Sequence, residues 1–341
     1  MMRKYIVGGI VCLLIIGFAT HSLEVVVWPG YASSSKIPTH WEMSAIVATS
    51  GDLWVSPFGT EQKLLQFLGN TSDILYIQTY DFTHKTIRSL LKKLAQGWTD
   101  VRIMMENKKY QQYQDTYKQI VDYFAHVLGV QIQSDKNLWT SYLHTKLNLT
   151  DDGYSIQTAN LTKSAFTNRE YFFVGHDPAI HDNLLRLFLQ DWNAEPIVPA
   201  DIHPNLLVCP INCRQVIESL LSNAQISIQM ETQYVVDARI LAILQAKKNL
   251  AIKVVVANVD TNDEFLYAFG PSIGKYLPKP YVHAKAILVD DRYLMIGSVN
   301  LSANSMDENR ELGIITTDRK VIETYKKQFV RDWEDSKGKR K

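Results

Sequence analysis

Two copies of one short pattern hold the residues of this sequence whose types and spacing are best suited to catalysis. The first copy is His144-Thr145-Lys146, with Asp151 after four more residues, and the second is His283-Ala284-Lys285, with Asp290 at the same spacing. Both copies lie in sequence typical of strands, where residues two apart point to the same face. Each histidine is therefore expected to project beside its lysine.

Further matches follow each copy at similar distances. The matched pairs are Thr158 with Ser298, Asn160 with Asn300, and Glu170 with Glu311. The separation from histidine to glutamate is 26 residues in the first copy (170 − 144) and 28 in the second (311 − 283). A metal site would need three or four converging ligands, and a lysine beside each histidine disfavours a bound cation. We therefore predict a catalytic site with no metal and no other cofactor.

These residue types suit the cleavage of a phosphodiester, which is an anion and repels nucleophiles. Lysine, amide and hydroxyl donors can hold the non-bridging oxygens and stabilise charge in the transition state. A neutral imidazole oriented by a carboxylate can attack phosphorus, and a second, protonated imidazole can donate a proton to the leaving alcohol. One histidine from each copy supplies both functions, so the sequence predicts one site shared by the two copies.

The elements that must position these residues are themselves repeated. In the first half, expected strands at 74–77 and 101–104 flank an amphipathic helix at 87–94, and in the second half strands at 226–228 and 252–256 flank a helix at 240–244. Strands that alternate with helices predict an α/β sheet in each half. A cluster of prolines between residues 194 and 204 predicts the boundary between the halves.

Two other features of the halves bear on function. Each half ends in the same tail, Asp191-Trp192 and Asp332-Trp333, and this symmetry predicts packing of a closing helix rather than catalysis. The segments 108–123 and 265–281 precede the two patterns, differ from one another and are rich in aromatic residues. We expect these segments to shape substrate choice, because loops over a shared scaffold usually do.

With these residues in place, the sequence resembles the phospholipase D superfamily, whose hallmark is a duplicated His-x-Lys-x-x-x-x-Asp motif. The resemblance covers roughly residues 55–333 and points to exported bacterial-type phospholipase D-like or cardiolipin synthase-like proteins. It implies an α/β fold of two pseudo-symmetric α/β/α lobes, at 45–195 and 205–335, with the active site at their interface. Because the chain carries both lobes, a monomer could assemble a complete site.

The resemblance also implies a role for each matched residue. One histidine would be the nucleophile and the other the general acid, and the usual order in the superfamily provisionally makes His144 the nucleophile and His283 the acid. The other catalytic residues would be Lys146, Asp151, Lys285 and Asp290. Substrate would be bound by Asn160, Asn300, Ser298 and Thr158, and the histidines would be oriented across the interface by Glu170 and Glu311. The first copy departs from the usual Gly-Ser pair at Gln157, whose bulk is expected to affect substrate fit.

The N-terminus indicates export. Arg3 and Lys4 precede an uncharged, mostly apolar run at residues 5–19, which is shorter than the roughly 20 residues that span a membrane. We interpret residues 1–22 as a signal peptide or a membrane anchor, and both place the bulk of the chain outside the cytoplasm, secreted or anchored. There Cys209 and Cys213 could form a short disulfide, although two small packing residues near a helix start fit the sequence equally well.

The sequence determines the reaction better than the substrate. The leading hypothesis is a phospholipase D-type phosphodiesterase, which cleaves or transfers the phosphatidyl group of a glycerophospholipid at a membrane surface through a covalent phosphohistidine. The alternatives are a cardiolipin synthase-type phosphatidyltransferase and a secreted, metal-independent endonuclease. The net charge of +1 provides no general attraction to nucleic acid, so a nuclease would need a local basic groove. An inactive binding module is disfavoured because both copies keep every motif residue, and no obligate protein partner is evident.

Overall fold

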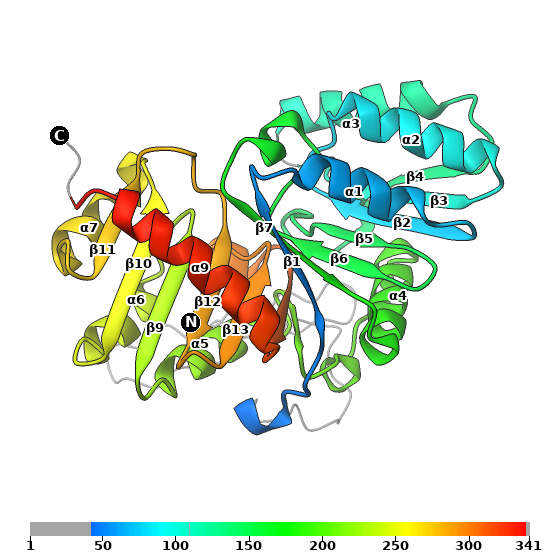
Figure 1. Cartoon of the computed structure of the whole chain (residues 1–341). Helices are drawn as coiled ribbons and strands as arrows, with labels where there is room; N and C mark the ends of the chain where they lie inside the picture. The colour runs from blue at the N-terminus through cyan, green and yellow to red at the C-terminus, as the bar shows by residue number, and fades with distance from the viewer. Residues whose placement is uncertain (1–41, 109, 339–341) are drawn as a thin grey trace, which may run out of the picture. The chain divides into compact units, whose positions relative to one another are not determined.

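The computed structural model describes residues 42–108 and 110–338, and it divides them into two α/β lobes (Figure 1). The first lobe contains β1 (Gly51–Ser56), α1 (Thr60–Gly69), β2 (Ile74–Thr79), α2 (Lys85–Gln96), β3 (Asp100–Met105), α3 (Gln111–Phe124), β4 (Val130–Ser134), β5 (Leu147–Leu149), β6 (Tyr154–Gln157), β7 (Glu170–Gly175) and α4 (Pro178–Trp192). The predicted leader or anchor at 1–22 lies outside the described residues.

The second lobe repeats this sequence of elements with small differences. It contains β8 (Leu206–Val208), α5 (Cys213–Ser222), β9 (Ser227–Thr232), α6 (Ala238–Ala246), β10 (Ala251–Ala257), α7 (Asp263–Phe269), β11 (Gly274–Leu277), β12 (Lys285–Val289), β13 (Tyr293–Gly297), α8 (Ala303–Asp307), β14 (Leu312–Thr316) and α9 (Arg319–Asp335). Short 3-10 helices lie at Met43–Ala45, Asp135–Asn137, Lys163–Phe166, Pro199–Asp201 and Asp260–Asn262.

The two sheets have the same topology. In the described part of the chain each has seven strands, in the order β1-β7-β6-β5-β2-β3-β4 and β8-β14-β13-β12-β9-β10-β11. In each sheet three strands pair in parallel, β2-β3-β4 and β9-β10-β11, and the other pairs are antiparallel. The predicted fold class, an α/β protein of two pseudo-symmetric lobes, is therefore confirmed.

Local sequence accounts for the helices that surround the sheets. In α2 the buried residues Ile87, Leu91 and Ala95 recur every four positions, which places them on one helix face. The closing helices α4 and α9 begin in the same way, because the carboxylates of Asp177 and Asp318 each accept backbone N–H groups of the first turn. These caps set where each closing helix starts.

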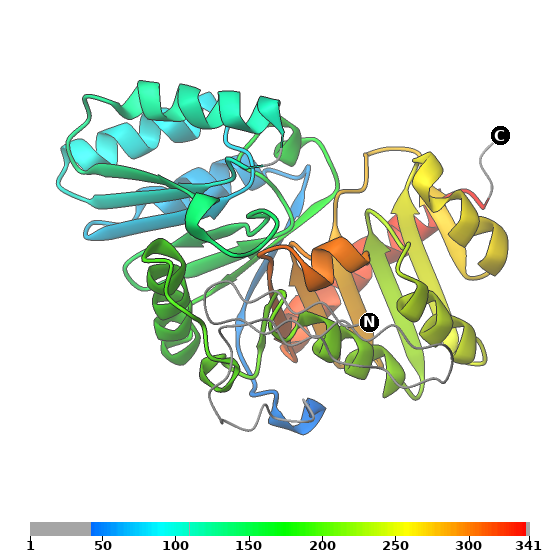
Figure 2. The ribbon, with the colours of Figure 1, turned by 180° about the vertical axis from the view of Figure 1, so that it is seen from behind.

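Each sheet has an outer face and a face that belongs to a shared core. The helices α1, α2 and α3 cover one face of the first sheet, and α5 and α6 lie on the opposite side of the second sheet from α9 (Figures 1 and 2). The largest core cluster joins both sheets and both closing helices, with Phe173 and Phe188 from the first lobe packed in one group with Ile296 and Phe329 from the second. This shared apolar core holds the lobes together and brings the two histidine segments to one interface.

Candidate active site

Backbone hydrogen bonds join each histidine segment to the other lobe. The His144 N–H donates to the Arg310 carbonyl (2.8 Å), and the Arg310 N–H donates to the Tyr142 carbonyl (3.0 Å). In the matching place, the His283 N–H donates to the Arg169 carbonyl (3.1 Å), and the Arg169 N–H donates to the Tyr281 carbonyl (2.8 Å). The glutamate that follows each arginine in the sequence is thereby set against the histidine of the other lobe.

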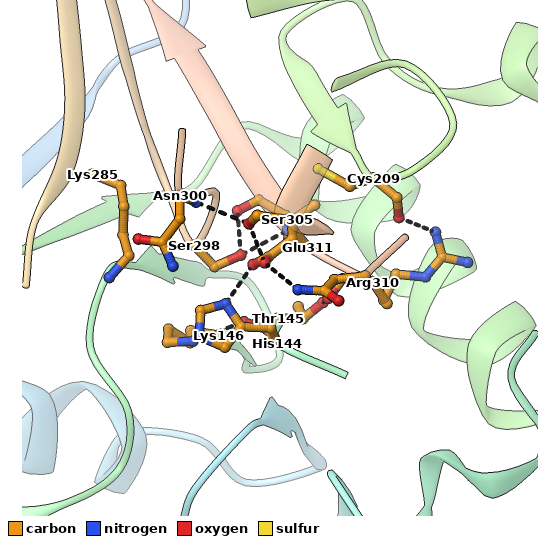
Figure 3. Close-up of polar contacts among 12 residues, drawn as sticks. His144, Thr145, Lys146, Cys209, Lys285, Ser298, Asn300, Ser305, Arg310 and Glu311 are labelled. Carbon is orange, nitrogen blue, oxygen red and sulfur yellow. Dashed lines mark hydrogen bonds and ion pairs between the residues drawn. The ribbon is translucent and has the colours of Figure 1, made fainter. Parts of the chain in front are cut away.

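The two histidine–glutamate pairs are crossed between the lobes. The Nδ1 of His144 lies 2.7 Å from Oε2 of Glu311, and the Nδ1 of His283 lies 2.7 Å from Oε1 of Glu170 (Figure 3 shows the first pair). Both glutamates are fully buried carboxylates. A carboxylate at Nδ1 favours the tautomer with its proton on Nδ1, so the Nε2 lone pair of each imidazole is left for chemistry.

Hydroxyl and amide donors in turn hold the glutamates. The Oε1 of Glu311 accepts from the Ser305 hydroxyl (2.5 Å) and the Asn309 amide (3.3 Å), and the Oε2 of Glu170 accepts from the Thr158 hydroxyl (2.5 Å). Ser298 exchanges hydrogen bonds with the backbone of Leu312, and its hydroxyl also helps to lower the pKa of Glu311.

These contacts show what the Thr158 and Ser298 hydroxyls bind within the protein, and their predicted role in substrate binding stays a prediction. Both side chains are completely buried, and their hydrogen bonds are used to position glutamate and backbone. The sequence pattern placed the hydroxyls near the site correctly, but it did not show which partner they face.

The two lysines lie at the centre of the site. Lys146 Nζ donates to the His144 carbonyl (2.7 Å) and Lys285 Nζ to the His283 carbonyl (2.6 Å), so each lysine folds back beside its histidine. Burial lowers the pKa of Lys146 to about 7 and that of Lys285 to about 8, although the nearby glutamates act in the opposite direction. An anionic phosphate bound between them would favour their charged forms.

Burial also keeps both histidines neutral. It lowers the pKa of His144 to about 4 and lowers that of His283, although the paired glutamate opposes the change in each case. The charge of Lys285 helps to lower the pKa of His144 across the interface, and the charge of Lys146 helps to lower that of His283. The charges of both lysines are therefore felt by both histidines, as expected of one shared site.

Asn300 lies next to this group, and Asn160 occupies the matching position of the first lobe (Figure 3 shows Asn300). Each follows the turn that leaves β6 or β13, and the side-chain Oδ1 of each is buried without a hydrogen-bond partner among the described residues. The Asn300 N–H donates to Ser305 Oγ (2.9 Å), which ties this asparagine to the residue that also holds Glu311 (Figure 3). Of the predicted substrate-binding residues, these two keep an uncommitted side-chain oxygen beside the site.

Asp151 and Asp290 make their hydrogen bonds away from the histidines, and their predicted support of catalysis stays a prediction. Asp151 accepts three backbone N–H groups from residues 72–74 (2.7, 3.0 and 2.8 Å), and Asp290 accepts those of residues 225–227 (2.9, 2.7 and 2.9 Å). Each aspartate sits after its strand, β5 or β12, whereas the histidine precedes that strand. Because a strand rises about 3.3 Å per residue, the histidine and the aspartate of each motif lie at opposite ends of the strand. The aspartates instead bind the backbone at the starts of β2 and β9.

The Gln157 side chain makes its hydrogen bonds within the first lobe. Its Oε1 accepts from Asn148 Nδ2 (3.2 Å) and its Nε2 donates to the Ala159 carbonyl (3.0 Å). The expected effect of its bulk on substrate fit stays a prediction. At the matching Gly297, an added Cβ would lie 2.4 Å from the Leu312 carbonyl oxygen, so the glycine is needed for close packing of β13 on β14.

The sequence interpretation missed two arginines that fasten the lobes beside the site. Arg169 forms a two-point ion pair with Asp332 (2.7 and 2.9 Å), and Arg310 pairs with Asp191 (2.9 Å). Each pair joins a segment of one lobe to the closing helix of the other, and no side chain of either pair is more than 4% exposed. The sequence contains a sign of these pairs, because both halves have an Asn-Arg-Glu triplet, at 168–170 and 309–311, and an Asp-Trp tail.

Cys209 and Cys213 form a disulfide next to one of these arginines. The Arg310 Nη1 donates to the Cys209 carbonyl (2.9 Å; Figure 3). Within residues 42–108 and 110–338, no three His, Cys, Asp or Glu side chains are grouped to hold a metal ion. No helix in the same part of the chain has the length and apolar character required to cross a membrane.

Known proteins share the sequence pattern and the fold. A family model described as "Cardiolipin synthase, PLD-like domain" matches residues 64–192 and 217–333. A mitochondrial cardiolipin hydrolase of Xenopus laevis is 28% identical over 108 residues, which are 29% of this chain and 49% of the relative. A probable cardiolipin synthase of Bacillus subtilis (strain 168) is 27% identical over 131 residues, which are 34% of this chain and 26% of the relative. The match thus spans about half or less of these relatives' length.

One solved structure matches nearly the whole described chain. The crystal structure of phosphatidylserine synthase from Haemophilus influenzae Rd KW20 aligns with 85% of this chain and 88% of its own, with a TM-score of 0.67 and 12% identity. At this level of identity the likeness concerns the fold. It agrees with the two-lobed architecture described above.

Proposed function

The chain belongs to the phospholipase D superfamily, and from that premise we propose that it cleaves or transfers the phosphatidyl group of a glycerophospholipid through a covalent phosphohistidine on His144. Membership of that superfamily and the names of the relatives support a phosphodiesterase or phosphatidyltransferase of the phospholipase D type. The observation that carries the finer proposal is the crossed pairing of His144 with Glu311 and of His283 with Glu170, around two buried lysines.

The first step follows from these contacts. The Nε2 lone pair of His144 attacks phosphorus, a P–N bond forms, and the P–O bond to the headgroup alcohol breaks. The leaving oxygen takes the proton of the His283 imidazolium. His283 alone holds its proton weakly because it is buried, but the bound phosphodiester anion raises its pKa again. Lys146 and Lys285 hold the non-bridging oxygens as charge builds on them.

The second step regenerates the enzyme. A water molecule or an acceptor alcohol gives its proton to His283 and attacks phosphorus, and the P–N bond to His144 breaks. Water produces phosphatidate, and an alcohol produces a new phosphatidyl ester. The names of the relatives, a cardiolipin hydrolase and a probable cardiolipin synthase, support a phospholipid substrate and include both outcomes.

We also propose an extracytoplasmic location for the enzyme. The Cys209–Cys213 disulfide supports this location, because disulfides persist in oxidising compartments. The basic start and the apolar run of the N-terminus support it from the sequence. Protease accessibility of the tagged chain in intact cells tests the location, and complete protection would contradict it.

The proposed reaction is tested with the purified full-length chain in detergent micelles. Labelled phosphatidylglycerol, phosphatidylcholine and single-stranded DNA are offered separately, each with and without EDTA. We expect phospholipid turnover that survives EDTA, and loss of turnover in His144→Asn and in His283→Asn. His176→Asn is the control, because His176 is an exposed histidine outside the site. Cleavage of DNA alone, or full activity in either active-site variant, would reject the proposal.

A further inference from the structure

The walls beside the two histidines differ in chemistry. The residues directly after β2 are Tyr80 and Asp81, whereas those directly after β9 are Gln233 and Tyr234. The Tyr80 ring lies edge-on to the His144 imidazole, with ring centroids 4.8 Å apart, and Lys146 Nζ lies 5.7 Å from the centre of the same ring. The first lobe therefore covers its histidine with an aromatic ring, whereas the second lobe places an amide at the matching position.

Gln233 organises a polar wall on the second lobe. Its Nε2 donates to the hydroxyl oxygens of Tyr234 (3.0 Å) and Tyr281 (2.9 Å), and its Oε1 accepts from Lys285 Nζ (3.3 Å). The two tyrosine hydroxyls also hydrogen bond to one another. One amide thus connects a phosphate-binding lysine to a pair of hydroxyls, and one hydroxyl proton of the pair is left to donate elsewhere.

This wall lies next to His283, because the Gln233 N–H donates to the carbonyl of the adjacent Ala284 (2.9 Å). Tyr281 is two residues before His283, is 37% exposed and forms part of the surface at the interface. The side chain of His283 is also more exposed than that of His144, 14% against 10%. The rings of Tyr80 and Tyr142 lie against the His144 imidazole, whereas among the described residues no aromatic ring contact is found at His283. The half of the site that contains His283 is therefore the more open one.

The chemistry of this wall fits a ligand that carries hydroxyl groups. A tyrosine hydroxyl can donate and accept one hydrogen bond each, which matches the donor and acceptor of an alcohol group. A cationic headgroup would instead meet the like charge of Lys285 behind Gln233. Burial and the Tyr281 hydroxyl raise the pKa of Tyr234 to about 12, so this phenol keeps its proton at neutral pH.

We propose that Gln233, Tyr234 and Tyr281 form the site for the alcohol that leaves and enters during the reaction, and that they select a polyol such as glycerol. The inference rests on the proposed function, in which His283 exchanges a proton with that alcohol. The alcohol can be the headgroup of a phosphatidylglycerol substrate or a free acceptor. Because the second step is the first step in reverse, both sources use the same wall.

The test measures selectivity ratios in Tyr234→Phe and Tyr281→Phe, with the purified full-length chain in mixed micelles. The first arm measures kcat/KM for phosphatidylglycerol relative to phosphatidylethanolamine. The second arm supplies equal concentrations of glycerol and 1-propanol and measures the ratio of the two phosphatidyl esters. We expect each variant to lower both ratios about 3- to 10-fold, the effect of one lost neutral hydrogen bond. Both ratios are internal to one protein sample, so a partly folded variant does not change them.

Two variants serve as controls. Tyr142→Phe changes the tyrosine at the matching position of the first lobe and should leave both ratios unchanged, whatever its effect on rate. Trp98→Phe changes an exposed aromatic residue just after α2 (95% exposed), outside the segments expected to shape substrate choice, and should leave both rates and ratios unchanged.

Unchanged ratios in both Tyr234→Phe and Tyr281→Phe would overturn the inference. A change of the ratios in Tyr142→Phe would also overturn it, because the alcohol would then occupy the His144 side. These outcomes differ from failure of the proposed function, in which the unmodified chain turns over no phospholipid at all.

Discussion

Replacement of Glu311 by glutamine tests whether the crossed carboxylates set the chemistry of the histidines. Glutamine has nearly the same shape as glutamate, so the buried position stays filled, but its amide can donate a proton to His144 Nδ1. The imidazole would then carry its proton on Nε2, which is the atom that must attack phosphorus. The matched variant is Glu170→Gln, which has the same effect on His283.

The size of the effect follows from the 2.7 Å contact between a fully buried carboxylate and the imidazole. A hydrogen bond to a charged group contributes about 1.5–3 kcal/mol, which corresponds to about 10- to 150-fold in rate. The wrong tautomer adds to this loss, and the comparable Asp-to-Asn change in a serine protease triad costs about 10⁴-fold. We therefore expect Glu311→Gln to slow the first turnover by about 10³- to 10⁴-fold.

The assay compares the burst of alcohol release from two phosphodiesters. One is a phospholipid, whose leaving alcohol needs a proton, and the other is a 4-nitrophenyl phosphodiester, whose leaving group does not. If His144 is the nucleophile, Glu311→Gln is slow on both substrates, whereas Glu170→Gln is slow on the phospholipid and regains most of its rate on the nitrophenyl ester. The reverse pattern would make His283 the nucleophile, and a loss below tenfold in both variants would refute the tautomer argument.

Three further predictions concern stability and pH. Arg169→Met leaves the Asp332 carboxylate buried without its main partner, and should lower the free energy of unfolding by about 3–5 kcal/mol in urea titrations. The double variant with Asp332→Leu should regain most of the lost stability. An unchanged urea midpoint in the single variant would contradict this prediction. The pKa values of Lys146 and Lys285 are lowered to about 7 and about 8, so both lysines lose their charge as pH rises through this range. KM for phospholipid should therefore rise above about pH 8, whereas kcat should change less because bound phosphate keeps the lysines protonated. A constant KM up to about pH 10 would count against this prediction. Asp290→Asn should lower the melting temperature but keep kcat within a few fold, and a loss of turnover at unchanged melting temperature would return Asp290 to the active site.

The residues that sequence reasoning placed correctly are those whose role is local. His144 and Lys146 are two positions apart in extended chain, so their proximity follows from strand geometry alone. The alternating strands and helices of both halves also follow from local periodicity. Because the pattern is repeated, the sequence also predicts a second lobe with its own histidine.

The contacts that the sequence did not specify have a common physical origin. Asp151 shares a motif with His144, but the six residues between them place it at the other end of β5, where it accepts the backbone N–H groups at the start of β2. Thr158 was placed near the site, but only the fold shows that its hydroxyl faces Glu170 and is fully used there. Position along the chain does not specify the partner of a side chain once that partner comes from another strand.

Residue type, spacing and duplication were enough to predict a two-lobed α/β chain of the phospholipase D superfamily with a histidine and a lysine from each half, because these depend on local geometry and on the chemistry of the groups themselves. The crossed pairs are different, since His144 meets Glu311 across 167 positions and Arg169 meets Asp332 across 163. Their pairing depends on how the two sheets pack through a shared core and on the register of the backbone hydrogen bonds between lobes. Contacts of that range exist only when the whole chain has folded, and they decide which carboxylate orients which imidazole.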